Sequence, residues 1–295
     1  MRRHRTTARG TFLALLLLGL AAVTGTARSA TSETEGTVPK LVFPLVAKTD
    51  LWDNYGDARG AHSHAGIDME NPWRAPVVAV EAGRVSYAES GLGGCMLYLY
   101  GRSGTMYMYI HLNNDLTARN DTRGGCVKDV TFAVPNDARV LAGEPIAWNS
   151  DSGDASGNPH LHFEVHPGGG ADTNPFRHLK NALRPLFAAK VGSQFSLGLR
   201  GELVAAGVGA VQIEVDRVRQ YPGGRWLDVD KRVVELSVSP DVFVASSLPD
   251  VSSVARRALR TPVAINAYTV RAKTTTDAIV GAAGVLSASR ISVQR

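Results

Sequence analysis

The sequence predicts an all-β protein, and three observations carry this prediction. Short apolar runs alternate with polar residues at the two-residue period of a strand rather than at the 3.6-residue period of a helix. Glycine and proline, 30 and 14 of the 295 residues, interrupt these runs at short intervals. No long helical periodicity precedes Asn174. We therefore expect two β-rich domains, of which the first is a sandwich or a barrel.

The first β region is expected to span residues 41–185, after a flexible lead-in of small and polar residues at 28–40. Its candidate strands are 41–46, 76–89, 95–101, 105–112, 144–148 and 160–165. The segment NPFRHLKNAL (174–183) is expected to close the domain as a short helix, because Pro175 suits a first helical turn.

The second β region, residues 191–295, loosely resembles small secreted OB-like barrels. Strands are expected at 195–218, 231–238, 241–246, 262–272 and 284–294, with one helix at 251–259. The sequence has no histidine or cysteine after His178 and no glycine-rich phosphate loop in this region. We therefore expect a binding or spacing module of unknown partner rather than a second active site.

Residues 1–27 have the three parts of a secretory signal peptide: four arginines, the apolar run 11–23, and small residues before a cut after Ala27. The alternative is an uncleaved membrane anchor, but the run is short for a span. We thus expect export to the cell wall or periplasm, with no membrane insertion after cleavage. Four of the 32 Lys and Arg residues lie in the signal, which leaves 28 against 27 acidic residues. That balance supports no nucleic-acid partner.

Cys95 and Cys126 are the two cysteines of the chain. In an exported protein an isolated pair is most simply a disulfide. Neither residue belongs to a C-x-x-C pair, so a metal-binding role is disfavoured. The bridge would tie the segment 113–129 to a neighbouring strand, and we expect that segment to form a wall of a substrate groove.

The stretch NPHLHFEVHP (158–167) carries three of the eight histidines. As a strand, it points His160, His162 and Glu164 to one face and Leu161, Phe163 and Val165 into a core. On a helix, the first two rings would point about 200° apart and could not share a site.

Two further segments supply polar groups of the same kind. HSHAGIDME (62–70) places His64 and Asp68 four residues apart, with Gly66 between them. YMYIHLNND (107–115) is expected to present Tyr107, Tyr109 and His111 on one strand face. Each segment alone is ordinary, but two imidazoles and a carboxylate make an open zinc site, and two spare histidines are suited to acid–base work beside it. The helical H-E-x-x-H motif is absent.

Four segments together, 64–85, 109–112, 141–147 and 156–165, resemble the lysostaphin-type or LytM-like zinc metallopeptidases. The resemblance implies a β-sandwich built from a duplicated hybrid motif, and an endopeptidase that cuts the stem or cross-bridge peptides of peptidoglycan. It also implies one zinc per chain, and it identifies His64, Asp68 and His162 as the ligands. His111 and His160 match the two catalytic histidines of the family that do not bind metal.

The remaining polar residues near these motifs are expected to have supporting or structural roles. We expect Glu164 to orient a histidine ring rather than to act as a base, because it follows the ligand by two residues. Tyr109 could stabilise an oxyanion, although packing beside the site is favoured. His62 is expected in a loop, and His166 and His178 at structural or surface positions.

These inferences predict a secreted, monomeric zinc endopeptidase that acts by metal-assisted amide hydrolysis on peptidoglycan peptides. Two alternatives stay open. One is a wall-binding regulator that keeps the fold without activity, which predicts missing ligands, whereas this chain retains all five positions. The other is a secreted protease acting on Gly-rich proteins.

Overall fold

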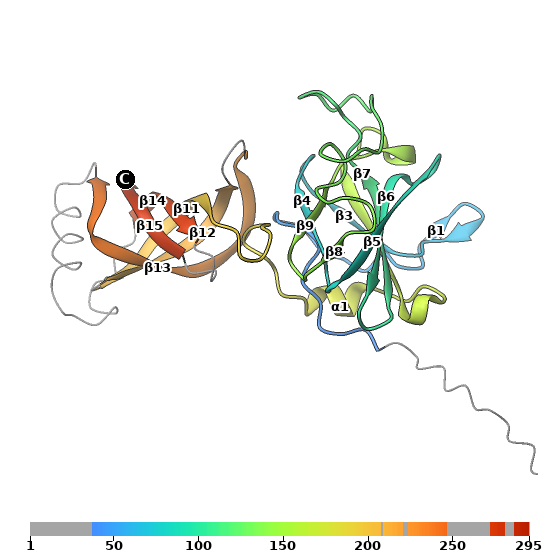
Figure 1. Cartoon of the computed structure of the whole chain (residues 1–295), viewed down its shortest axis with the longest axis horizontal. Coiled ribbons are helices and arrows are strands. Elements are labelled where there is room, and N and C mark those ends of the chain that lie inside the picture. Colours follow the sequence, from blue (N-terminus) through green and yellow to red (C-terminus); the bar gives the residue numbers. More distant parts are fainter. Residues whose placement is uncertain (1–36, 208, 221–223, 247–271, 281–285, 295) are drawn as a thin grey trace, which may run out of the picture. The chain divides into compact units, whose positions relative to one another are not determined.

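A computed structural model describes residues 37–207, 209–220, 224–246, 272–280 and 286–294 (Figure 1). The predicted signal peptide, most of the lead-in, the predicted helix at 251–259 and most of the predicted strand at 262–272 lie outside the described residues. Among the described residues, no helix has both the length and the apolar character needed to span a bilayer.

A six-stranded sheet forms the framework of the first β region (Figure 1). Its strand order is β3-β10-β7-β6-β5-β8, and its pairs are antiparallel. The strands are β3 (Ile67–Glu70), β5 (Gly83–Ser90), β6 (Gly94–Gly101), β7 (Met106–Leu112), β8 (Arg139–Val140) and β10 (His160–His166). Because β10 lies between β3 and β7, the three histidine-bearing segments of the sequence are neighbours in space.

Smaller elements complete this region. β4 (Pro76–Val78) and β9 (Pro145–Trp148) form a two-stranded sheet, and β1 (Ala58–Arg59) pairs with β2 (His62–Ser63) in a hairpin. The 3₁₀ turns η1 (Gly153–Ala155) and η2 (Pro167–Gly169) flank β10, and α1 (Phe176–Lys180) follows. The predicted closing helix is thus confirmed, though it is shorter than expected.

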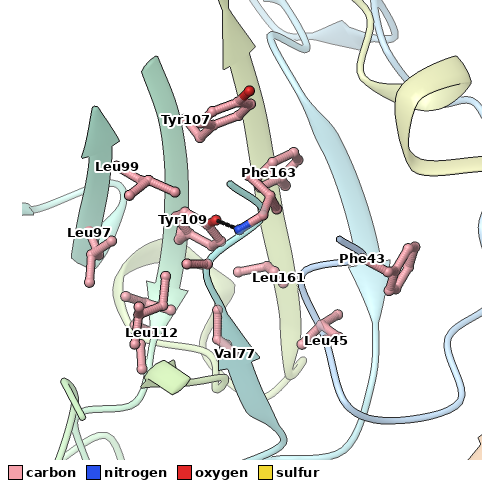
Figure 2. Close-up of a cluster of buried hydrophobic side chains, with 14 of the residues drawn as sticks. Phe43, Leu45, Val77, Leu97, Leu99, Tyr107, Tyr109, Leu112, Leu161 and Phe163 are labelled. Atoms are coloured by element: carbon pink, nitrogen blue, oxygen red, sulfur yellow. Dashed lines mark hydrogen bonds between the residues drawn. The ribbon is translucent and has the colours of Figure 1, made fainter. Parts of the chain in front are cut away.

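Side chains from both sheets share one hydrophobic core (Figure 2). Val77 of β4 and Leu161 and Phe163 of β10 are fully buried in it, as the period of the β10 sequence predicts. The core therefore holds one face of β10 and leaves His160, His162 and Glu164 on the other. The all-β sandwich expected from the sequence is confirmed.

Two predicted strands of this region differ from the structure. Residues 41–46 make only isolated bridges, at Val42 and Leu45, because Pro44 has no amide hydrogen to continue a ladder. The single strand expected at 76–89 is two strands in different sheets, β4 and β5. A side chain at Gly83 would meet the carbonyl oxygen of Tyr100 at 2.3 Å, so the second strand begins where only glycine fits.

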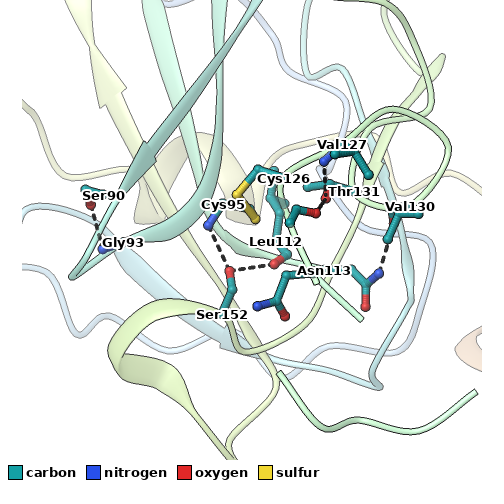
Figure 3. The surroundings of a disulfide bond; sticks show 12 residues. Ser90, Gly93, Cys95, Leu112, Asn113, Cys126, Val127, Val130, Thr131 and Ser152 are labelled. Carbon is teal, nitrogen blue, oxygen red and sulfur yellow. Dashed lines mark hydrogen bonds between the residues drawn. A yellow bond between two sulfur atoms is a disulfide. The ribbon is translucent and has the colours of Figure 1, made fainter. Parts of the chain in front are cut away.

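The disulfide between Cys95 and Cys126 is present, with the two Cα atoms 5.2 Å apart (Figure 3). It links β6 to the inserted segment 113–129. Ser152 lies beside it, donating to the Leu112 carbonyl at 2.6 Å and accepting from the Cys95 amide at 2.9 Å. The bridge thus anchors the insertion to β6, while Ser152 links the segment after β9 to β6 and β7.

The second β region is a closed five-stranded barrel in the order β11-β12-β13-β15-β14. Its strands are β11 (Phe195–Gly207), β12 (Ala210–Gln220), β13 (Leu227–Ser246), β14 (Ala272–Val280) and β15 (Leu286–Gln294). β13 and β15 are parallel, and the other pairs are antiparallel. Five strands closed into a barrel agree with the OB-like expectation.

Strand boundaries in the barrel differ from those predicted. Residues 231–238 and 241–246 belong to one long strand, β13. The sequence pattern missed β14, whose run KTTTDAI has three consecutive threonines and only two apolar residues. Thr274 and Thr276 point into the barrel and are buried. A threonine methyl group can fill core space, and hydropathy undervalues it at such positions.

Candidate metal centre

His64, Asp68 and His162 form the one group of possible metal ligands found among the described residues. Asp68 on β3 lies directly opposite His162 on β10, so cross-strand pairing turns both side chains to the same face. His64 precedes β3, and Gly66 lets the chain approach β10, because a side chain there would meet the Phe163 carbonyl at 2.5 Å and the His162 ring at 2.8 Å. From the sequence, Gly66 was expected to let the backbone turn. The structure shows instead that glycine is required because the chain passes close to β10.

The three side chains converge on a single point. His64 Nε2 and His162 Nδ1 lie 3.0 Å apart, and they lie 3.0 and 2.8 Å from Asp68 Oδ1. Bonds of about 2.0–2.2 Å to a tetrahedral zinc would separate such ligand atoms by roughly 3.3–3.6 Å. A zinc ion therefore fits after ring and carboxylate shifts of a few tenths of an ångström.

Hydrogen bonds on the outer nitrogens orient the two rings for this role. His64 Nδ1 lies 2.7 Å from the Asn54 carbonyl oxygen, and His162 Nε2 lies 2.9 Å from Glu164 Oε1. Both partners are acceptors, so each outer nitrogen donates. In neutral rings, the lone pairs of the inner nitrogens would face one another and Asp68, so the arrangement favours a positive charge, a proton or a metal ion, between them.

The electrostatics of the cluster agree with that preference. Burial lowers the pKa of His162, but hydrogen bonds to Asp68 and Glu164 outweigh burial and raise the pKa to about 9. Burial likewise opposes ionisation of Asp68, yet its contacts with His162 and His64 hold the pKa of its carboxyl well below the usual range. The same negative field favours a divalent cation at this point.

His111 and His160 lie beside the three candidate ligands. The ring centroids of His111 and His160 are 4.8 Å apart, and His160 Nε2 lies 3.7 Å from Asp68 Oδ1. Their Nδ1 atoms donate to the carbonyls of Ser152 and Asn158, each at 2.8 Å. His160 thus turns its Nε2 toward the cluster, whereas His111 Nε2 lies 3.8 Å from Asp154 Oδ1.

His111 reaches the cluster through an unusual backbone conformation. Its φ is +62°, in the left-handed region that side chains rarely adopt. The strand period is broken there, so the prediction that His111 shares a face with Tyr107 and Tyr109 is wrong. Both tyrosines are fully buried in the core, while His111 lines the groove. Burial, and then the neighbouring His160, lower the pKa of His111 to about 4.

Tyr109 packs in the core and does not reach the histidines. Its hydroxyl accepts a hydrogen bond of 3.0 Å from the Val80 amide, away from the cluster (Figure 2). Burial raises its pKa well above the ordinary value. Tyr109 therefore has the packing role that the sequence favours, and the alternative role at an oxyanion does not fit its position.

Glu164 lies where the sequence places it, behind His162. Its second oxygen, Oε2, lies 2.7 Å from His166 Nε2, and His166 Nδ1 lies 3.0 Å from the Gly170 carbonyl oxygen. Contacts with both histidines outweigh burial and lower the pKa of Glu164 to about 2. His166 is thus more than a surface residue, since it holds the carboxylate that orients a ligand.

Two residues near the cluster were not singled out from the sequence. Asn54 holds β3 by accepting from the Asp68 amide at 3.1 Å and donating to the Asp68 carbonyl at 3.3 Å. Arg59, on the hairpin, donates to Asp68 Oδ2 at 2.5 Å, opposite the oxygen that faces the histidines. Neither belongs to a recognisable motif, and only folding brings them to Asp68.

The cluster lies in a groove of about 910 Å³. Its walls come from the β1–β2 hairpin, from the β5–β6 turn at Leu92, and from the segment around η1. No residue of 113–129 lines it, so the expectation that this insertion forms a groove wall is wrong. Buried Asp115 instead holds the insertion against the indole nitrogen of Trp73, at 2.8 Å. His62 lies in β2 and lines the groove.

A β-sandwich whose open face gathers two histidines, an aspartate and two further histidines has the architecture of a metallopeptidase. Residues 62–175 match the model of Peptidase family M23. The resemblance predicted from the motifs is confirmed.

Comparison with solved structures returned proteins of the same type. A putative M23 peptidase from Pseudomonas aeruginosa is 19% identical, with a TM-score of 0.35. The match covers 49% of this chain and 52% of the Pseudomonas chain. The catalytic domain of lysostaphin from Staphylococcus simulans is 24% identical with a TM-score of 0.36, covering 45% and 92%. A zinc-containing peptidase from Vibrio cholerae is 22% identical with a TM-score of 0.36, covering 49% and 41%. The chain thus spans about half of the Pseudomonas protein. No curated protein sequence matched it.

Proposed function

We propose that this protein is an exported zinc endopeptidase that hydrolyses peptide bonds in the stem or cross-bridge peptides of peptidoglycan. The observation that carries the proposal is the cluster of His64, Asp68 and His162, with His160 near Asp68 and the His111 ring beside His160. The match to the M23 family supports the same class of reaction. Export is supported by the signal sequence at residues 1–27, and we propose that the mature protein acts as a monomer.

His64, Asp68 and His162 would hold one zinc ion per chain. Zinc in such a site supplies a Lewis acid that polarises a carbonyl and lowers the pKa of water to about 7. The lowered pKa of His111 keeps its ring neutral at physiological pH, so its Nε2 can take a proton from the attacking water. His160, 4.8 Å away between ring centroids, is placed to donate to the developing oxyanion or to the leaving amine.

The groove supports an extended peptide as substrate. Leu92, Met96 and Ile110 offer apolar contacts on one side of the cluster, while Asp57, Glu70 and Asp154 add acidic groups around it. A peptide with basic or free-amine side chains would complement these carboxylates. Peptidoglycan peptides of that kind fit the groove better than strongly acidic ones.

The rival proposal is a non-catalytic regulator that binds the wall. It requires a fold without a working site, whereas here each of the five polar positions is filled and each histidine is held in one orientation. A secreted protease acting on Gly-rich proteins would use the same chemistry. Only the substrate tested can separate that possibility from wall hydrolysis.

The test pairs metal content with cleavage. We expect about one zinc per purified chain and release of muropeptides from purified peptidoglycan. His160→Ala and His111→Ala should keep the zinc and lose cleavage by about 10²–10⁴-fold, the usual contribution of acid–base groups. His178→Ala, on α1 and outside the groove, is the matched histidine control and should change neither quantity.

The outcomes separate the alternatives. Stoichiometric zinc without cleavage of any wall type favours the regulator, and cleavage of Gly-rich proteins but not of walls favours the secreted protease. Absence of zinc from the purified protein and after zinc addition would overturn the site.

A further inference from the structure

The two carboxylate oxygens of Asp68 have different partners. Oδ1 lies 3.0 Å from His64 Nε2 and 2.8 Å from His162 Nδ1, inside the cluster. Oδ2 instead accepts a hydrogen bond of 2.5 Å from Nη2 of Arg59. The carboxylate is therefore divided between the candidate metal centre and an arginine that is not one of the candidate ligands.

A short hairpin brings Arg59 to this oxygen. Arg59 ends β1 and is followed by a two-residue turn, in which Gly60 has a φ of +64° that glycine favours. At the base of the hairpin, the Gly56 amide donates to the His64 carbonyl, and the His64 amide donates to the Asp57 carbonyl, each at 2.8 Å. Arg59 and the candidate ligand His64 consequently belong to one hydrogen-bonded unit, which fixes where the arginine begins relative to the cluster.

This ion pair differs from an ordinary surface pair of the same two residue types. In the pair of Arg84 with Asp137, the side chains are 54% and 62% exposed, so water competes for both partners. In the pair of Arg59 with Asp68, the arginine is 44% exposed but the aspartate only 16%. Within the described part of the chain, Arg59 is the only residue that donates to Asp68 Oδ2. Removing Arg59 would therefore leave a largely buried oxygen in need of another partner.

A metal ion at the cluster would be the nearest such partner. A carboxylate can bind a metal through one oxygen or through both. A catalytic zinc site has three protein ligands and keeps a further position open, which a second oxygen of the aspartate would occupy. A charge-assisted hydrogen bond to Oδ2 opposes that change, because it holds this oxygen on the side away from the histidines.

We propose that Arg59 is a positioning residue that limits Asp68 to one metal-binding oxygen and so keeps a coordination position open for the attacking water. The metal and the reaction in this statement rest on the proposed function. Arg59 acts through Asp68 in this view and does not touch the reacting atoms. Because Arg59 also lines the groove, the alternative is direct contact with the substrate, which would change KM rather than the metal site.

The test replaces zinc by Co²⁺ in the purified protein and records its visible absorption, which weakens when a four-coordinate site becomes five-coordinate. Arg59→Met keeps the length of the side chain and removes its donors. The variant should still bind about one Co²⁺ per chain, and its visible band should weaken about twofold or more. With zinc bound, kcat for a soluble cross-linked muropeptide should fall about tenfold or more, and KM should change less than about threefold.

Two further variants separate the hydrogen bond from other effects of the substitution. Arg59→Lys keeps a charged donor and should recover most of the loss in both the absorption band and kcat. Arg84→Met removes the exposed ion pair with Asp137, outside the groove, and is the matched control. It should change neither the cobalt spectrum nor the kinetic constants.

Several outcomes would overturn the proposal. An unchanged cobalt spectrum in Arg59→Met would do so, as would a rise in KM with unchanged kcat, which places Arg59 at the substrate. Loss of Co²⁺ binding would assign Arg59 to metal retention instead. Cleavage by the wild type with an unaltered spectrum in Arg59→Met defeats this inference alone. The expected spectral change without cleavage of any wall by the wild type defeats the proposed function alone.

Discussion

The two β regions bury different kinds of side chain. In the described residues of the barrel, the buried polar side chains are Thr274 and Thr276, and the rest of its core is Leu, Ile, Val and Ala. The first β region, residues 41–185, is called the M23 region below. It buries more polar side chains: Thr49, Asn54, His64, Glu81, Thr105, His111, Asn113, Asp115, Thr131, Glu144, Asn149, Ser150, Asp151, Ser152 and His160. A buried polar group lowers the stability of the folded protein unless it is paired. A high concentration of such groups therefore indicates a functional site in the M23 region.

The difference in buried polar groups also indicates which functions each region can have. Around Asp68, neighbouring strands and carbonyls hold each ring in one orientation, which is the preorganisation that catalysis requires. In the barrel, the described core is aliphatic apart from two threonines, so polar side chains such as Thr275 and Asp277 lie on its outer face. Any contact that this region makes with a partner would therefore form at its surface rather than in a buried polar cluster.

The largest expected effect comes from removing a ligand. His162→Ala deletes the inner Nδ1 and leaves Asp68 and Glu164 without their shared partner, so zinc content should fall below one tenth of a zinc per chain and cleavage should be lost. Metal analysis and a muropeptide assay check this. Full zinc content in the variant would show that the ion is held elsewhere.

The disulfide provides the next largest effect, and it acts on the M23 region only. Cys95→Ser with Cys126→Ser opens a loop with a sequence separation of 31 residues. The chain-entropy relation predicts a loss of about 3–4 kcal/mol in unfolding free energy. Urea unfolding followed by a probe in each region should show an earlier transition in the M23 region and an unchanged one in the barrel. Simultaneous shifts of both transitions would mean that the two regions unfold as one unit.

Zinc affinity should depend on pH with a defined sign. The pKa of His162 is raised to about 9, so in the metal-free protein the ring is protonated at pH 6–8 and must lose that proton to bind zinc. Apparent affinity should therefore increase roughly tenfold per pH unit across that interval. Titration against a chelator of known affinity at three pH values measures it. A flat profile would show that His162 is already neutral before zinc binds.

The smallest expected effect comes from the same Ile→Val substitution made once in each β region. Ile67 on β3 and Ile213 on β12 are both fully buried. Ile→Val at either position should cost about 0.5–1.5 kcal/mol of unfolding free energy. Ile67→Val should also reduce cleavage severalfold, because Ile67 adjoins Asp68, whereas Ile213→Val should leave the rate unchanged. Equal rates in the two variants would show that packing beneath β3 does not set the ligand geometry.

Local pattern was sufficient for much of the M23 region. The period of residues 160–165 predicts which side chains of β10 face the core, and the spacing in 64–68 predicts two groups on one side. The disulfide followed from compartment and cysteine count. These features depend on neighbours close in sequence, or on a cysteine pair with no competing partner.

Long-range contacts decided the remainder. His111 reaches the other histidines only because its backbone leaves the strand conformation, and this same departure separates it from Tyr109. Asn54 and Arg59 reach Asp68 through loops whose course no local pattern specifies. Likewise, arginines on three different strands share the outer face of the barrel because of register.

The sequence by itself therefore determined the β architecture, the bridge and the identity of the metal-binding and catalytic candidates. Only the tertiary structure decided which groups hold those candidates, where the groove walls come from, and which side chains of the barrel strands share its outer face. Periodicity records which face of a strand is buried, whereas the pairing of distant strands is set by the packing of the whole core.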